Sequence, residues 1–377
     1  MDFSNDKRVV LTLDGGGTNF VFSAIQGNRE IVQPITYPSN GHELQPCLET
    51  IIKGFREISQ QLGTKPEAIS FAFPGPSDYL NGIIGNLENL PAFRGGVALG
   101  PMLEETFQVP VYINNDGDLF AYGEAISGFL PRVNQMLRKA GSTRQYKNLI
   151  GITLGTGFGA GLVRNNELIL GDNGAAGEIW VVRSKLHPHS FSEECVSIRA
   201  VKRVYAEHCS DCAGQNLTPK EIYEIALGQR MGHQEAAKEA FRQMGESIGE
   251  ALASALTLFD GLVVIGGGLA NAWPLFLPET IRELNGTIEK LDGRKIGRLE
   301  ISAFNLEDQN ETQQFIAGKV SRIKVPFSEK TILYDALKRT GIGISKLGTS
   351  QAVAIGAYAF ALNEIDKKVQ TNLLLQK

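Results

Sequence analysis

Two apolar segments of this chain end in glycine-rich turns whose backbone could bind phosphate. Residues 9–13 run into the first turn, and residues 149–154 run into the second. A buried strand that turns sharply on glycines leaves backbone N–H groups unscreened by side chains, and such a concavity suits phosphate oxygens. Two such turns predict two lobes that grip one nucleotide from both sides. The candidate phosphate-binding residues are Asp14, Gly15, Gly16, Gly17, Thr18 and Asn19 in the first turn and Gly155, Thr156 and Gly157 in the second.

Two aspartates follow predicted strands and could supply the chemistry of a phosphotransferase. Asp14 ends the first strand, and Asp116 follows the strand-like run 109–113. Carboxylates at the carboxyl ends of strands point into the crevice where α/β proteins bind ligands. We interpret Asp14 as a water-mediated partner of Mg²⁺ and Asp116 as the general base that accepts a proton from an attacking hydroxyl. The alternative for Asp116 is N-capping of the next helix, which is our interpretation of Asp118.

A third glycine cluster, Gly266, Gly267 and Gly268, follows the buried strand-like run 262–265. Three glycines at the end of a strand would let a flat base lie against the backbone. A strand-to-helix turn that needs close packing explains the same residues, and both interpretations stay open.

Strands alternate with amphipathic helices over the first third of the chain, which is typical of an α/β domain. Residues 20–26 are expected to form a hairpin strand that ends at Gly27-Asn28, and residues 119–128 a helix that joins the lobes. The second lobe repeats the hairpin around Asn165-Asn166. Other helices are expected over 43–62, 101–107, 197–208, 219–227, 234–259 and 350–362.

The chain is therefore predicted to form two α/β domains. A small N-terminal lobe covers 1–122, with the C-terminal helix over 350–377 packing back on it, and a larger lobe covers 123–349.

Size and charge restrict the class of protein. With 377 residues, 42% of them hydrophobic, the chain can bury a large core. A net charge of -4 without a long basic stretch argues against nucleic-acid binding. No apolar stretch is long enough to span a membrane, and residues 1–8 lack the apolar core of a secretion signal. The 4 cysteines do not form a disulfide framework, so a cytoplasmic protein is expected.

The order and spacing of several segments resemble the ROK family of sugar kinases and sugar-responsive repressors, within the actin-like ATPase superfamily. The segments are LDGGGTNF at 13–20, FPGP at 73–76, NLENLPAF at 86–93, PVYINNDGDLFAYGE at 110–124, GITLGTGFGAGLV at 151–163, GAAGEIW at 174–180, VVIGGGLA at 263–270 and AIGAYAFAL at 354–362.

The resemblance implies a two-lobed α/β fold of the actin-like ATPase (ribonuclease H-like) type, with a nucleotide cleft between the lobes. It implies ATP-dependent phosphorylation of a hexose or N-acetylhexosamine hydroxyl by a cytoplasmic homodimer that uses Mg²⁺. Asp116 matches the family's catalytic aspartate, and residues 155–157 match its second phosphate loop. The implied sugar-binding residues are Gly75, Asn89, Asn115, Asp116, Glu178 and Glu193.

Two departures from the family pattern concern the sugar site. The family follows its Gly-Glu with a Gly-His pair, whereas this chain has Trp180-Val181. Trp180 could stack on a sugar or an acyl group, or belong to the core. Glu193 falls where a further sugar-binding glutamate is expected, with Glu194 as a close competitor and a solvated acidic turn as the alternative for both.

The family's zinc-binding cysteine run is also missing. Other donors cluster in sequence, but Cys209 and Cys212 lack a second partner pair. We therefore predict a site without zinc. The remaining donors considered are His187, His189, Cys195 and His208.

The competing function is a sugar-binding regulator that does not phosphorylate. The family's repressors carry an additional N-terminal DNA-binding domain, for which the eight residues before the first strand leave no room. The polar region 279–348 is longer than the family's usual connection and could lie near the nucleotide or form an oligomer contact.

Overall fold

The computed structural model describes residues 3–15, 18–75, 77–85, 90–209 and 216–375. The chain divides into two compact units, each described by itself below. Unit 1 comprises Met1–Gly128, Gly161–Gly177 and Leu347–Lys377, and unit 2 comprises Phe129–Ala160 and Glu178–Lys346.

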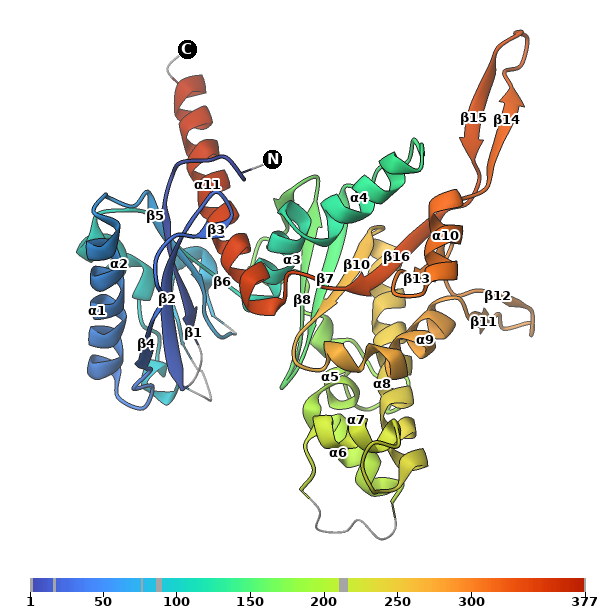
Figure 1. The fold of residues 1–377 in the computed structure, drawn as a ribbon, viewed down its shortest axis with the longest axis horizontal. Coiled ribbons are helices and arrows are strands. Elements are labelled where there is room, and N and C mark those ends of the chain that lie inside the picture. Colours follow the sequence, from blue (N-terminus) through green and yellow to red (C-terminus); the bar gives the residue numbers. More distant parts are fainter. Residues whose placement is uncertain (1–2, 16–17, 76, 86–89, 210–215, 376–377) are drawn as a thin grey trace. The chain divides into compact units, whose positions relative to one another are not determined.

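Unit 1 is built on a mixed sheet with the strand order β3-β2-β1-β5-β6, in which β4 also pairs with β2 (Figure 1). The β2–β3 hairpin turns at Gly27 and Asn28, whose φ angles of 58° and 61° suit a two-residue turn, as predicted. The strands are β1 (Val10–Gly15), β2 (Asn19–Gln26), β3 (Arg29–Glu30), β4 (Ile35–Pro38), β5 (Ala68–Ala72) and β6 (Val111–Asn114).

The three parallel strands of this sheet end at one edge and in register. Asp14 of β1 lies opposite Ala72 of β5, and Ala72 lies opposite Asn114 of β6. Residues that follow these positions in the chain therefore leave the sheet at the same edge.

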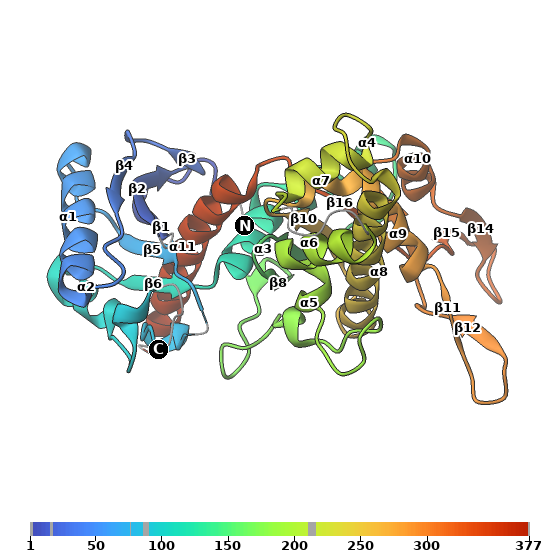
Figure 2. The same cartoon turned by 90° about the horizontal axis from the view of Figure 1, so that it is seen from below.

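Helices cover both faces of the unit 1 sheet (Figure 2). On one face, α1 (Leu44–Leu62) and α2 (Leu99–Phe107) bury apolar side chains such as Phe55 and Leu103 against those of β1, β2 and β5. On the other face, α11 (Thr349–Leu375) packs on β1 and β5 and also on α3 (Asp116–Ile126). The predicted C-terminal helix is thus confirmed, and it continues well beyond 362.

Helices α3 and α11 cross at glycines on both sides. A Cβ atom on Gly123 would overlap the carbonyl oxygen of Ala352, and one on Gly356 would overlap that of Leu119. The two backbones are therefore almost in contact, which only residues without a side chain permit.

Unit 2 contains most of a second sheet, with the order β13-β16-β10-β7-β8-β9. The division between the units passes along β8, and β10 pairs in parallel with both β7 and β16. The β8–β9 hairpin turns at Asn165 and Asn166 as predicted, with φ angles of 52° and 64°. The strands are β7 (Asn148–Leu154), β8 (Phe158–Arg164), β9 (Glu167–Leu168), β10 (Leu262–Gly266), β13 (Ser302–Asn305) and β16 (Arg339–Ile344).

The helices of unit 2 include three of the predicted ones, over 198–207, 219–226 and 234–258. Buried alanines and glycines on α8 allow α9 to approach it closely. None of the described helices combines the length and apolar character that crossing a membrane requires. The helices are α4 (Phe129–Lys139), α5 (Glu193–Val196), α6 (Ile198–Glu207), α7 (Pro219–Ala226), α8 (Gln234–Leu258), α9 (Trp273–Leu284) and α10 (Gln309–Ala317), and short 3-10 turns occupy Tyr79–Asn81, Pro91–Phe93, Ile179–Val181 and Ala270–Ala272.

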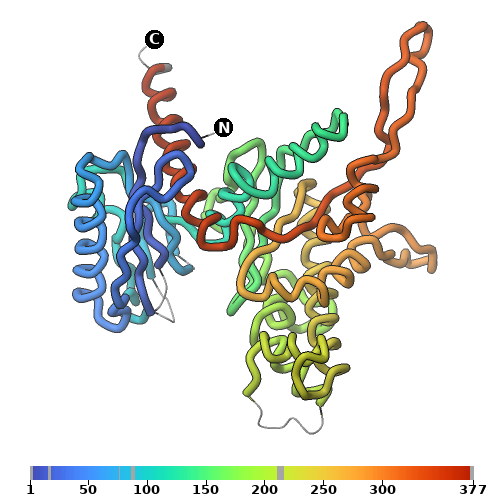
Figure 3. The backbone as a smooth tube through the Cα atoms, viewed as in Figure 1, coloured from blue at the N-terminus to red at the C-terminus, as the bar shows by residue number. Residues whose placement is uncertain are grey.

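The region 279–348 contains two separate ribbons in addition to β16 and the edge strand β13. One ribbon pairs β11 (Thr287–Glu289) with β12 (Lys295–Gly297), and the other pairs β14 (Val320–Lys324) with β15 (Thr331–Asp335). Both extend away from the rest of unit 2 (Figure 3). The second ribbon exposes large apolar side chains, namely Val320, Ile323, Phe327, Ile332, Leu333 and Tyr334.

Candidate active site

Two aspartates lie at the edge of the unit 1 sheet where its parallel strands end. Asp14 is the penultimate residue of β1, and Asp116 begins α3, two residues after the last residue of β6. Since Asp14 and Asn114 are both in register with Ala72, the two carboxylates leave the sheet close to one another. Both side chains keep surface open to solvent at this edge, although the surrounding protein crowds their carboxyl groups.

Both aspartates have raised pKa values. The protein around Asp116 displaces water from its carboxyl group, which raises its pKa, and the negative charge of Asp14 adds to this effect. Backbone N–H groups of Gly117 and Asp116 itself oppose it by stabilising the charged form. Desolvation alone raises the pKa of Asp14. A carboxylate whose pKa is raised toward neutral pH is better suited to accept a proton.

The helix that carries Asp116 is capped by its neighbour. The side chain of Asn115 accepts a hydrogen bond from the N–H of Gly117 at 2.7 Å and is the N-cap of α3. The prediction that Asp118 caps this helix is therefore wrong, because the helix begins two residues earlier and Asp118 is buried in its first turn. Asp116 Oδ1 accepts from the same Gly117 N–H at 2.9 Å, which fixes its carboxylate at the helix terminus.

Gly75 lies beside this pair on the loop after β5. A Cβ on Gly75 would overlap the Tyr79 hydroxyl and lie 3.6 Å from Asn115 Nδ2. The Tyr79 hydroxyl donates to the carbonyl of Phe73 at 2.9 Å. The structure thus brings Gly75 and Asn115 together and adds Tyr79, which no sequence pattern had indicated.

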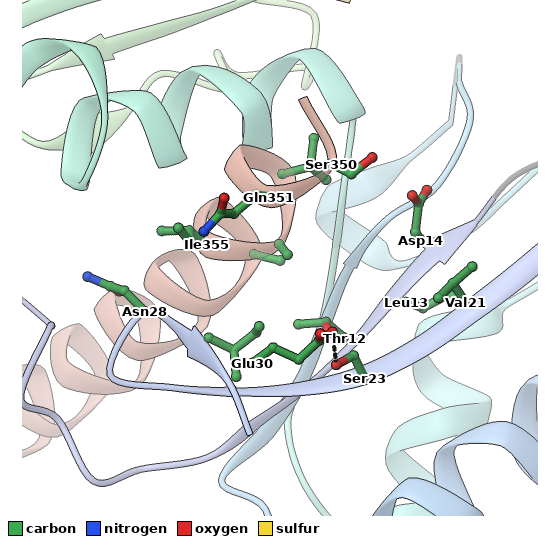
Figure 4. Close-up of a pocket in the computed structure, with 14 residues that line it drawn as sticks. Thr12, Leu13, Asp14, Val21, Ser23, Asn28, Glu30, Ser350, Gln351 and Ile355 are labelled. Carbon is green, nitrogen blue, oxygen red and sulfur yellow. Dashed lines mark hydrogen bonds between the residues drawn. The ribbon is translucent and has the colours of Figure 1, made fainter. Parts of the chain in front are cut away.

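A pocket of about 350 Å³ adjoins Asp14 within unit 1 (Figure 4). Strands β1 and β2 form one wall and the first turns of α11 the other. Ser350 lies toward Asp14, whereas Glu30 lies farther from Asp14 and accepts a hydrogen bond from the hydroxyl of Ser23. Ser350 and Gln351 were not predicted as site residues, although Thr349-Ser350 before an alanine-rich run is typical of a helix start.

The remaining predicted residues of unit 1 are described only in part. Thr18 and Asn19 are exposed at the start of β2, and the carbonyl of Thr18 accepts from the N–H of Ser39 at 2.9 Å. A Cβ on Gly15 would lie 3.2 Å from the Ala72 carbonyl oxygen, so this glycine packs closely on β5. The predicted residues Gly16, Gly17 and Asn89 lie outside the described residues.

Unit 2 holds the second and third glycine turns at one edge of its sheet. Gly266 of β10 lies opposite Thr153 of β7, so the two turns leave parallel strands at the same level. The N–H of Leu269 donates to the carbonyl of Leu154 at 3.0 Å and joins them. Within the second turn, the N–H of Gly155 donates to the carbonyl of Gly157 at 3.0 Å.

The glycines of these turns differ in whether backbone conformation or close packing requires a residue without a side chain. Gly267 has a φ of 90°, and a Cβ there would overlap the backbone of Leu154. Close packing therefore explains Gly267, in line with the interpretation of this cluster as a closely packed strand-to-helix turn. Gly155 and Gly268 have no such requirement, because no described atom lies within 4 Å of the place of their Cβ atoms.

Glu178 is the N-cap residue of the short 3-10 turn Ile179–Val181 in unit 2, and Trp180 lies within that turn. The indole Nε1–H of Trp180 donates to the carboxylate of Glu178. The half-buried Trp180 ring also meets Phe191 edge to face at 5.7 Å between centroids. Trp180 thus orients a candidate sugar-binding carboxylate and packs against its own unit at the same time.

Glu193 contacts the second glycine turn. Its Oε2 accepts from the N–H of Phe158 at 3.0 Å, and its Oε1 accepts from Arg199 at 2.8 Å. Glu194 bonds Arg199 as well, at 2.6 Å.

The candidate metal donors of unit 2 do not converge. His187 and His189 are exposed, buried Cys195 lies 3.2 Å from the hydroxyl of Ser184, and the ring of His208 bonds its own helix at Val204. Cys209 is disulfide-bonded, which removes its thiolate, and Cys212 lies outside the described residues. In the described part of the chain, no three His, Cys, Asp or Glu side chains are grouped as metal ligands would be.

Comparison with known proteins decides the family. The model of the ROK family matches residues 10–308, which include both carboxylates and all three glycine turns. This chain belongs to the ROK family. The resemblance noted in the sequence is therefore confirmed.

Individual proteins are similar to this chain over most of its length. The crystal structure of a glucokinase from Parabacteroides distasonis is 52% identical, with a TM-score of 0.88, and the match covers 96% of this chain and 99% of that one. An N-acetyl-D-glucosamine kinase of Photobacterium profundum is 28% identical over 288 residues, 71% of this chain and 87% of that protein. A ROK hexokinase from Thermus thermophilus is similar in fold, with a TM-score of 0.66 at 20% identity over 95% of this chain and 99% of that one. These likenesses confirm the predicted α/β fold class.

The raised pKa of Asp116 gives a prediction that needs no substrate. A carboxyl group whose pKa is higher in the folded than in the unfolded state destabilises the fold once it is ionised, and the penalty disappears as the pH falls below the unfolded value. Asp116→Asn is therefore expected to raise the melting temperature at pH 8, with the gain shrinking toward pH 3.5. Differential scanning calorimetry across this range measures it.

Asp6→Asn is the matched control within unit 1. The hydrogen bond from Arg8 lowers the pKa of Asp6, so this variant is expected to lose stability at pH 8 and to approach the parent protein at acid pH. A lower melting temperature for Asp116→Asn at pH 8 would contradict the assigned pKa direction.

Proposed function

We propose that this protein is an ATP-dependent sugar kinase that phosphorylates a hydroxyl of a hexose or an N-acetylhexosamine. The observation that carries the proposal is the pair Asp14 and Asp116 at one edge of the unit 1 sheet. Asp116 is fixed at the start of α3, and the pKa of its carboxyl group is raised. Membership of the ROK family and 52% identity to a glucokinase support it.

Asp116 is the general base of the proposed reaction. Its carboxylate accepts the proton of the sugar hydroxyl while that oxygen forms a bond to the γ-phosphorus of ATP and the bond to the β-phosphate oxygen breaks. The products are a sugar phosphate and ADP. The Gly117 N–H holds the carboxylate in place, and α3 carries it on a rigid element.

Gly155 and Gly268 form the proposed approach surface for the nucleotide. Their turns lie side by side at the edge of the unit 2 sheet, and neither glycine is required by its own φ or by packing. Backbone without side chains admits phosphate oxygens to the turn at residues 155–157 and a flat base to residues 266–268. Gly15, Thr18 and Asn19 are proposed to contact the phosphates from unit 1.

Asp14 is the proposed partner of Mg²⁺ through water. An exposed carboxylate at the end of a strand is a suitable oxygen donor for this cation, which keeps several of its waters when it binds beside phosphates. Bound Mg²⁺ would neutralise phosphate charge that develops during transfer.

Asn115, Gly75 and Glu178 are the proposed contacts of the acceptor sugar. Asn115 and Gly75 are neighbours beside Asp116, and Glu178 is oriented by the indole of Trp180. Charged and amide groups of this kind suit the several hydroxyls of a hexose. Glucose and N-acetyl-D-glucosamine, for which two of the relatives are named, are the first acceptors to test.

We also propose a cytoplasmic location, where ATP is available, and a homodimer. The apolar side chains exposed on the β14–β15 ribbon support association with another chain. Sedimentation velocity on the purified protein measures the oligomeric state, and a monomer would exclude the dimer.

A sugar sensor without catalysis is the second candidate. Trp180-Val181 in place of the family's Gly-His pair favours it, because the imidazole expected beside the sugar is missing.

The central prediction is sugar-dependent turnover of ATP that needs Asp116. In an ADP-coupled assay with Mg²⁺, one hexose or N-acetylhexosamine is expected to be phosphorylated, and Asp116→Asn is expected to lower kcat about 10²–10⁴-fold, the range for loss of a general base. Sugar binding by calorimetry should survive in that variant. Sugar binding without turnover in the parent protein would favour the sensor.

Two adjacent glycines give a matched test of the nucleotide surface. Gly268→Ala is expected to raise the KM for ATP about tenfold, near 1.4 kcal/mol, with an unchanged melting temperature. Gly267→Ala is expected to lower the melting temperature, because its φ of 90° and the Leu154 backbone both exclude a Cβ. An unchanged KM for ATP in Gly268→Ala would remove this residue from the nucleotide site.

A further inference from the structure

Two hydrogen bonds connect the ends of the second glycine turn to one short stretch of unit 2, residues 193–199. The N–H of Ile198 donates to the carbonyl of Gly155 at 2.9 Å. At the other end, the N–H of Phe158 donates to Glu193 Oε2 at 3.0 Å. The turn is therefore held by the first residue of α5 and the first residue of α6.

Arg199 connects the middle of the turn to the same stretch. Its Nη1–H donates to the carbonyl of Thr156 at 3.4 Å, and its Nη2–H donates to Glu193 Oε1 at 2.8 Å. Each carboxylate oxygen of Glu193 thus has its own partner, one on Arg199 and one on the turn. A Cβ on Gly157 would lie 2.8 Å from Glu193 Oε2, so glycine at this position lets the carboxylate reach the backbone.

Glu194 fixes the guanidinium from a second direction. Its Oε1 accepts from Arg199 Nε at 2.9 Å and from Nη2 at 2.6 Å. A planar guanidinium can hold several acceptors at once in a fixed geometry, which a lysine ammonium cannot reproduce. These bonds raise the pKa of Arg199, with Glu194 as the larger cause and Glu193 as the second.

The internal bonds leave the centre of the turn as its ligand-facing part. The N–H groups of Gly155 and Phe158 are used within the protein, by Gly157 and Glu193. The N–H groups of Thr156 and Gly157 are then the candidates to meet phosphate oxygens. The direction in which these N–H groups point depends on the contacts that hold the turn, because the phosphate would be bound by backbone groups alone.

We propose that Arg199 is a positioning residue for ATP, which acts through Glu193 and the Thr156 carbonyl to hold the second glycine turn in its phosphate-binding shape. The inference rests on the proposed kinase function. It assigns Glu193 to the turn, in place of the sugar contact that the family resemblance implies.

The test compares Arg199→Gln with the parent protein. Binding of the imido analogue of ATP with Mg²⁺ is measured by calorimetry, and loss of charge-assisted bonds at a half-exposed site is expected to weaken it about 3- to 20-fold. The KM for ATP should rise in parallel while the KM for the sugar stays unchanged. Amide hydrogen exchange in residues 155–158 should become faster, and Arg199→Lys should give intermediate values.

Arg203→Gln is the matched control on the same helix. Arg203 bonds Glu207 and the backbone carbonyl of Glu194, and neither contact involves the turn, so this variant should bind the analogue like the parent. Equal binding and exchange in Arg199→Gln and the parent would overturn this inference alone, as would a rise in the sugar KM. Failure of the parent protein to bind the analogue would instead contradict the proposed function. If Arg199→Gln does not fold, Arg199→Lys decides by the same measurements.

Discussion

The candidate chemistry depends on parallel strands that end together. Because β1, β5 and β6 share a register, Asp14, Gly75 and Asp116 leave the sheet at one edge although they are far apart in sequence. The same constraint acts in unit 2, where β7 and β10 end at one level and place two glycine turns side by side. Neither arrangement needs long-range side-chain contacts. Each follows from backbone hydrogen bonding in a parallel sheet, with residues of the right type at the strand ends.

Glycines at these strand ends serve different physical purposes. Gly267 is required by its φ and by the approach of the Leu154 backbone, and Gly157 leaves room for the Glu193 carboxylate. Gly155 and Gly268 have open space around the place of a Cβ. Tight packing by the first kind holds the turns rigid, and the second kind leaves backbone accessible. A turn that contains both kinds of glycine can have a fixed conformation and still leave its N–H groups uncovered by side chains. Both properties are needed to bind phosphate through backbone N–H groups.

Much of this fold and site could be predicted from the sequence, since apolar runs, turn residues and motif order are local signals. The strands before all three glycine turns, the asparagine hairpin turn at 165–166 and the family follow from such signals. The start of α3 could not be predicted from such signals, because Asn115, Asp116 and Asp118 are all good capping residues. Only the hydrogen bond from the Gly117 N–H to the Asn115 side chain identifies the cap. Arg199 and Tyr79 carry no motif. Arg199 acts on Thr156, which is 43 residues earlier in the chain, and Tyr79 bonds the carbonyl of Phe73 within a loop that has no sequence signature. The ribbons of 279–348 lacked the burial pattern that reveals a strand, because their side chains are exposed on both faces.

The glycine crossing of α3 and α11 has a consequence for synthesis of the chain. Unit 1 is assembled from three separate stretches of sequence, and its last helix packs both on the strands β1 and β5 and on α3, the helix that carries Asp116. About 220 residues separate the end of α3 from the start of α11, so roughly 10 to 45 seconds of translation pass between them at ~5–20 residues per second. During that time, the apolar face that α11 will cover is unprotected on the ribosome. Folding of unit 1 can therefore be completed only after this final helix has been synthesised.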